Sequence, residues 1–306
     1  MGRLERSWGI FRKSLALMNQ ERKLLIFPIL SFLAGLLLVL LIIAGITGIV
    51  WFFLQNPELA GSATGAFAEG GAEDEPSGLF TVVCFVVFAV LYLVTMLLTN
   101  FFSVAFFSEI MRGLRGEAVS IGRGFRFALQ RFNAILLWSL LASTVGVVLS
   151  VLEERAGLIG KLILKFVGVV WAVASVFAIP AIICDVELLN PFKALKRSAQ
   201  TIRETWGESL IGFVGLQIIT GTGVLLFVVG VVLLFLLGHV VGFSVPVLIF
   251  LAAMVTLMIL GLLVLGYLVG VAQKIYIAAL YLYANEESVI GDFTEEEIAS
   301  AFRPKK

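Results

Sequence analysis

The side chains best placed to do chemistry in this sequence are Glu109, Asp185 and Lys274, each near one end of a long apolar run. A charged group at bilayer depth is costly, so ionisable residues in such runs often mark an ion or substrate path. We interpret the three as an inner polar cluster or gate, with Asn100 as a further polar group in the second apolar run. The alternative, which the sequence favours, is that they lie separately at the membrane interface and never meet.

Other kinds of chemistry lack a recognisable motif. The chain contains no HExxH zinc motif, no GxSxG nucleophile elbow and no phosphate-binding Walker loop. His239 is the single histidine, and the two cysteines, Cys84 and Cys184, fall in separate apolar runs near opposite membrane faces. We therefore expect no enzyme, no catalytic residue, no metal and no cofactor.

The composition indicates an integral membrane protein. Hydrophobic residues make up 60% of the 306 residues and charged residues 14%, whereas soluble domains carry about 25% charged residues. A net charge of +1 predicts no nucleic-acid partner. A membrane-spanning helix needs roughly 20 apolar residues. Six runs are long enough: about 24–54, 79–108, 134–152, 159–184, 208–237 and 246–284. We therefore predict an all-α fold.

The distribution of positive charge predicts the orientation of these spans. Short loops rich in Lys and Arg stay in the cytoplasm, and most of the basic residues fall in the N-terminal segment and in the second and fourth connections. The first connection, 55–78, has no basic residue. We therefore expect a multi-pass protein of the cytoplasmic membrane with both termini in the cytoplasm.

A polar stretch at 190–206 has the periodicity of an amphipathic helix. Asn190 suits the N-cap and Pro191 the first helical position. Its apolar side chains recur every three or four residues, as on one helix face that contacts lipid or the bundle: Phe192, Leu195, Ala199, Ile202 and Trp206. Two further segments show the same pattern: Leu4, Trp8, Phe11, Leu15 and Met18, and Ile121, Phe125, Leu129 and Phe132.

The basic residues of these three helices are the candidate binding residues. Each Lys or Arg near an anionic membrane surface contributes roughly 1 kcal/mol to binding. The helices could therefore hold anionic lipid head groups or dock a cytoplasmic protein, or they could only orient and anchor the spans. The candidate residues are Arg12, Lys13, Arg123, Arg126, Lys193, Lys196, Arg197 and Arg203.

The order of basic helix, polar break and apolar span recurs three times. We therefore divide one transmembrane domain, 1–285, into repeat units at about 1–110, 111–187 and 188–285, each an amphipathic cytoplasmic helix with a transmembrane hairpin. Residues 286–306 form an acidic cytoplasmic tail.

Two smaller signals concern packing. Pro28 and Pro180 interrupt apolar helices at the entry to the first span and near the exit of the fourth. Gly266 and Gly270 form a GxxxG pattern, which is typical of closely approaching membrane helices.

Several stretches together resemble a known group of proteins: "ERSW", "LLIFPILS", "GFRFALQRFNAILLWSLLASTVG" and "NPFKALKRSAQTIRETWGE". They are similar to an uncharacterised family of prokaryotic six-span membrane proteins, and the likeness covers nearly the whole chain. A more distant resemblance is to the membrane domain preceding the catalytic barrel of some glycerophosphodiester phosphodiesterases, carried by Pro191, Lys196, Arg197, Trp206 and Gly207. These resemblances imply a fold and a location, and no activity.

The leading functional prediction is a non-enzymatic membrane module whose basic helices bind anionic lipid or a protein partner. The alternative is a transporter or channel for a small or lipophilic substrate, with a path between the repeats past Asn100 and the three ionisable residues.

Overall fold

The computed structural model describes residues 17–56, 78–184, 190–204, 206–242 and 244–286, which form helices and turns without any β-strand. Six helical segments in these ranges are long and apolar enough to cross a membrane. They match the six predicted runs: Arg22–Gln55, Val82–Leu114, Phe132–Arg155, Leu158–Cys184, Thr220–Val241 and Val245–Leu282. The protein is therefore an all-helical, multi-pass membrane protein.

The chain divides into two compact units. Unit 1 comprises Met1–Leu25, Glu109–Val119 and Ser198–Lys306, and unit 2 comprises Ile26–Ser108 and Ser120–Arg197. The elements are η1 (Arg22–Leu25), α2 (Ile26–Gln55), α4 (Gly78–Leu114), α5 (Ile121–Gln130), α6 (Phe132–Arg155), α7 (Leu158–Ala174), α8 (Ala178–Cys184), α9 (Pro191–Glu204), α10 (Trp206–Val241) and α11 (Val245–Glu286). Helices α4 and α9 each contribute residues to both units.

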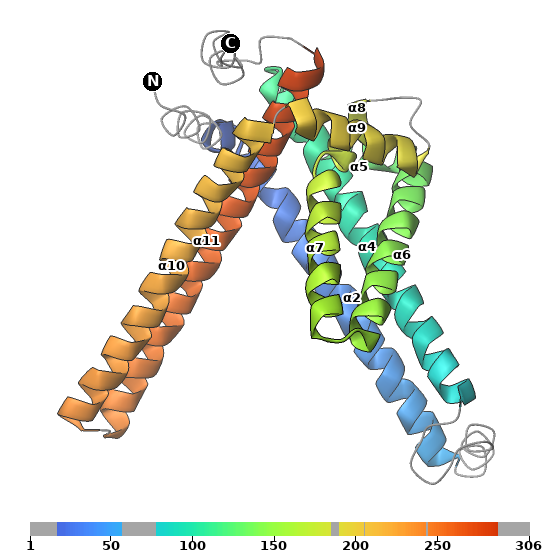
Figure 1. Cartoon of the computed structure of the whole chain (residues 1–306). Coiled ribbons are helices and arrows are strands. Elements are labelled where there is room, and N and C mark those ends of the chain that lie inside the picture. Colours follow the sequence, from blue (N-terminus) through green and yellow to red (C-terminus); the bar gives the residue numbers. More distant parts are fainter. Residues whose placement is uncertain (1–16, 57–77, 185–189, 205, 243, 287–306) are drawn as a thin grey trace. The chain divides into compact units, whose positions relative to one another are not determined.

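In unit 2, α6 and α7 form a tight antiparallel pair joined by a two-residue connection. Helices α5 and α8 and the start of α9 lie at the opposite end of this pair (Figure 1). The indole rings of Trp138 and Trp171 stack between α6 and α7, with centroids 6.2 Å apart. The buried cluster beside them joins α6, α8 and α9: Ala134, Trp138, Ala178, Ile182 and Ala194.

The fourth span is broken between α7 and α8, as the proline predicted. The residues Ser175, Val176 and Phe177 form a turn, in which the Ser175 N–H still donates to the Trp171 carbonyl. Pro180 has no N–H for the carbonyl of Val176, so the regular ladder cannot continue through this point. Pro28, in contrast, lies in the first turn of α2, where a missing N–H costs little.

Aromatic rings attach α5 to the spans of unit 2. The ring of Phe125 lies 5.4 Å from that of Phe102, 5.9 Å from that of Phe27 and 6.0 Å from that of Phe101. Phe27 also stacks on Phe106, with centroids 5.4 Å apart, and this contact brings the start of α2 against α4. The short helix α5 is therefore held by one inserted side chain with three aromatic neighbours.

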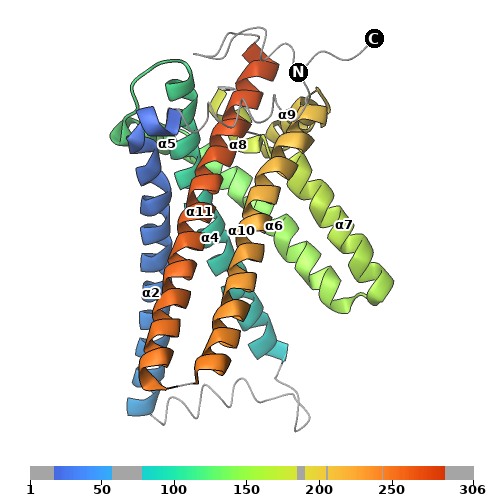
Figure 2. The ribbon, with the colours of Figure 1, turned by 90° about the vertical axis from the view of Figure 1, so that its left-hand side faces the viewer.

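In unit 1, α10 and α11 run antiparallel and side by side (Figure 2). A Cβ atom added to Gly223 would lie 2.5 Å from Leu265 Cδ2, and one added to Gly230 would overlap Met258 Cε. The two glycines are seven residues apart on α10, and Met258 and Leu265 are seven residues apart on α11. The two contacts therefore lie along one face of each helix. Among the residues whose side chains are described, a Cβ atom on Gly266 or Gly270 would have no neighbour within 4 Å, so the predicted GxxxG contact stays a prediction.

The ends of this helix pair are also defined. At the turn, Gly242 has φ +89° and its N–H donates to the Gly238 carbonyl, which closes α10 with a left-handed cap. Toward the other end, the Tyr267 hydroxyl donates to the Leu25 carbonyl, and Lys23 Nζ donates to the Val119 carbonyl at 3.4 Å. These two bonds attach η1 to α11 and to the segment that follows α4.

We predict that Gly223→Leu destabilises the α10–α11 pair, because the added side chain would overlap Leu265. Overpacking of this kind costs about 1–3 kcal/mol. Gly221→Leu is the matched control, since a Cβ atom there has no neighbour within 4 Å. The unfolding temperature in detergent should fall for Gly223→Leu and stay near the wild-type value for Gly221→Leu. Equal losses in both variants would contradict the proposed contact.

Candidate functional site

The predicted basic residues of α5 and α9 lie at or near the protein surface. Arg123 is half-buried, whereas Arg126 and the four basic residues of α9 are exposed: Lys193, Lys196, Arg197 and Arg203. Arg12 and Lys13 lie outside the described residues. The structure thus presents two short helices with exposed cations, each immediately ahead of a long apolar helix.

Large apolar side chains are exposed on the same two helices. Phe192 on α9 is 64% exposed and Leu129 on α5 is 63% exposed. Phe192 and Lys196 are four residues apart, so they lie on neighbouring turns of one face. A surface with aromatic and basic side chains in alternation is typical of a helix at a membrane interface.

The apolar side chains of α9 differ in how far they are buried. The prediction left open whether it contacts lipid or the bundle, and the structure divides it: Phe192 is exposed and Ile202 is buried. Small side chains fill the buried face instead, namely Ala194, Ser198 and Thr201. Small residues allow close helix approach, and the bulky Phe192 is left on the outside.

The start of α9 is capped as the sequence predicted. The Phe192 N–H donates to Asn190 Oδ1 at 2.9 Å, and Pro191 occupies the first helical position. The cap therefore satisfies one of the backbone donors that the first turn leaves without a helical partner.

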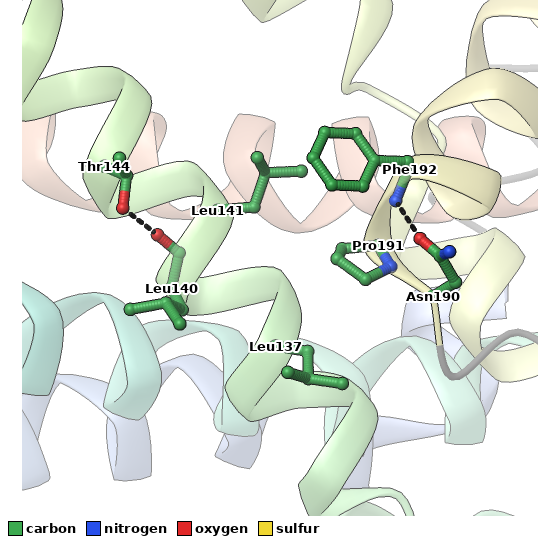
Figure 3. Close-up of a pocket in the computed structure, with 7 residues that line it drawn as sticks. All are labelled: Leu137, Leu140, Leu141, Thr144, Asn190, Pro191 and Phe192. Carbon is green, nitrogen blue, oxygen red and sulfur yellow. Dashed lines mark hydrogen bonds between the residues drawn. The ribbon is translucent and has the colours of Figure 1, made fainter.

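An apolar groove of about 610 Å³ lies between this capped end and α6 (Figure 3). Leu141 and Phe192 point toward one another across it, and the Pro191 ring faces α6 (Figure 3). Thr144 Oγ1 donates to the Leu140 carbonyl at 2.7 Å, so its hydroxyl serves its own helix. The lining residues are Leu137, Leu140, Leu141, Thr144, Asn190, Pro191 and Phe192.

The residues predicted to form an inner polar cluster occupy different environments. Glu109 is fully buried in α4, and its carboxylate lies 3.9 Å from the Arg112 guanidinium. Lys274 is half-buried in α11. Glu109 and Lys274 belong to unit 1, and Asp185 lies outside the described residues. The cluster of three therefore stays a prediction.

Asn100 belongs to unit 2 and has a partner that the sequence did not indicate. Its Nδ2 donates to Ser139 Oγ at 2.9 Å, which links α4 to α6. Ser139 is fully buried. About two helical turns further along the same interface, a Cβ atom on Gly146 would lie 2.6 Å from Tyr92 Oη, so α4 and α6 approach closely there as well.

Four threonine hydroxyls inside the apolar helices donate within their own helix. Thr47, Thr95, Thr99 and Thr256 each donate to the carbonyl four residues earlier. Among the described residues, no group of three or more His, Cys, Asp or Glu side chains is arranged to hold a metal ion.

The six long apolar helices define the class as multi-pass membrane proteins. Within that class, the chain belongs to a family of unknown function (DUF6159), whose model matches residues 82–291. No curated protein and no solved structure matches the chain significantly. The more distant resemblance to the phosphodiesterase membrane domain therefore stays a prediction.

We predict that the Asn100–Ser139 hydrogen bond contributes a measurable coupling energy. In Asn100→Leu, Ser139→Ala and the double variant, the stability changes should be less than additive by about 0.6 kcal/mol, with about 1.7 kcal/mol as an upper bound for such bonds. Reversible unfolding in detergent micelles measures these energies. Additive single changes would contradict a stabilising role for this bond.

Proposed function

We propose that this protein is a non-enzymatic membrane module that binds anionic lipid head groups of the cytoplasmic leaflet through α5 and α9. The observation that carries the proposal is the exposure of Phe192 and Leu129 on the helices that also present exposed basic side chains. In a soluble protein these apolar side chains would be unfavourable, whereas at an interface they enter the acyl region. The cations beside them would then lie at the depth of the phosphates.

The order of elements supports this arrangement. Helix α5 leads into α6 through the single residue Arg131, and α9 leads into α10 through residue 205. The long helices expose apolar side chains along most of their length, as a lipid environment requires. We therefore propose the predicted orientation, with basic helices inside, and the division into repeat units that each begin with such a helix.

A lipid ligand explains these features better than a cytoplasmic protein partner does. A protein interface typically loses charged residues at its centre and keeps an apolar core. Here Lys193 and Lys196 both follow Phe192 within about one turn, so the exposed ring has two cationic neighbours on its own helix. Alternating charge and apolar surface instead suits a boundary between head groups and acyl chains.

The orientation can be tested with single cysteines in a variant in which Cys84 and Cys184 are replaced. We predict that Gly157→Cys, in the α6–α7 connection, reacts with a membrane-impermeant maleimide in intact cells. Arg126→Cys, on α5, should react only after the cells are permeabilised. The opposite pattern would place the basic helices outside and would overturn the proposal.

Lipid binding can be tested by native mass spectrometry of protein incubated with phosphatidylglycerol. We predict that Lys193→Gln with Lys196→Gln weakens binding by about tenfold or more, since each cation contributes roughly 1 kcal/mol. Lys161→Gln with Lys165→Gln, two exposed lysines on α7, is the matched control and should change binding little. Equal effects of both pairs would show that α9 has no special role.

A further inference from the structure

We propose that the groove between α6 and the start of α9 holds one acyl chain of an anionic phospholipid, with its phosphate at Lys196. This inference rests on the proposed function, because it assumes that α9 lies at the cytoplasmic interface. It goes further by assigning a discrete site, one lipid and the residues that contact each part of that lipid.

The groove has the size and surface of an acyl-chain site. Its volume of about 610 Å³ lies within the roughly 300–1,000 Å³ of typical ligand pockets. Four of its residues are Leu or Phe, and Leu137, Leu140 and Phe192 are 41%, 48% and 64% exposed. An apolar occupant would pack against these partly exposed side chains and cover them.

Two polar side chains of the groove already make hydrogen bonds. The Thr144 hydroxyl donates to the Leu140 carbonyl, and Asn190 Oδ1 accepts the Phe192 N–H. Figure 3 shows both bonds at the margins, with leucine, proline and phenylalanine side chains between them. The walls therefore favour a hydrocarbon chain over a polar substrate.

The depth of the groove fits one leaflet. At 1.5 Å per residue, Leu137 and Thr144 lie about 8 Å and about 18 Å along α6 from its first residue. Half of a hydrocarbon core is about 15 Å thick. With the start of α6 at the cytoplasmic interface, these residues of α6 lie largely at the depth of the inner-leaflet acyl chains, which a water-soluble partner would not enter.

The charged end of the proposed site follows from the helix geometry of α9. Phe192 and Lys196 share a face one turn apart, and Leu195, beside Lys196, packs against the buried cluster of α6 and α8. A lipid whose chain passes Phe192 thus has its phosphate within reach of an exposed ammonium group. A lipid with net negative charge is favoured over a zwitterionic one, because Lys193 and Arg197 add positive charge nearby.

The test is to fill the groove without changing any charge. Leu140→Trp places an indole in it, and Leu152→Trp is the control: it lies on the same helix and is 49% exposed, against 48% for Leu140. Native mass spectrometry of each full-length variant with phosphatidylglycerol should show at least a threefold weaker first binding step for Leu140→Trp alone. Equal lipid binding by both variants would contradict the proposed acyl-chain site.

The same measurement separates this site from the general proposal. If the Lys193→Gln, Lys196→Gln variant loses lipid and Leu140→Trp does not, head-group binding by α9 stands and the groove assignment is wrong. If neither variant differs from the wild type, both proposals are wrong.

A second measurement uses the unmodified protein and so does not depend on the folding of a variant. Phosphatidylglycerol with a photoreactive diazirine in its acyl chain is crosslinked to the wild type, and the labelled peptides are identified. Crosslinks concentrated in 137–144 and 190–192 would support the site. Labelling spread evenly over the exposed apolar helices would overturn it.

Discussion

The structure depends on one constraint: a backbone that crosses hydrocarbon must satisfy its hydrogen bonds internally. Six long helices meet this requirement along most of their length. Within the described part of the fourth span, the helix is interrupted at Ser175, Val176 and Phe177, and Pro180 has no N–H to donate to the Val176 carbonyl. Phe177, Ala178 and Pro180 are buried, so the irregular backbone lies against protein. Irregular backbone is tolerated at membrane depth in such places.

Packing between these helices must come from close contact, since apolar burial gives little advantage over lipid. In α10, glycine allows this close contact, because Leu265 and Met258 of α11 pack against Gly223 and Gly230. Aromatic rings supply it in unit 2, where Phe125 reaches three neighbours and Trp138 stacks on Trp171. The short helix α5 therefore keeps its place through a side chain, while its cations stay near the surface.

Several features could be predicted from the sequence because they depend on local chemistry. The spans follow from the length of apolar runs, the break from Pro180, and the start of α9 from Asn190 and Pro191. Features that need two distant segments could not. The groove joins residues about fifty positions apart, and the partner of Asn100 is 39 positions away. The contacts of Gly223 and Gly230 were missed for the same reason, because thirty glycines give no indication of which one meets a neighbour.

The glycine contacts of α10 also limit how the gene for this protein can change. Gly223 with Leu265 and Gly230 with Met258 are related by one antiparallel register, centred on the turn that Gly242 begins. Surface loops usually accept insertions and deletions. One residue added inside α11, between the turn and Met258, would rotate both bulky side chains by about 100° about the helix axis, since a helix has 3.6 residues per turn, and would move them off their glycines. The number of residues between Gly242 and Met258 is thus constrained by helix packing.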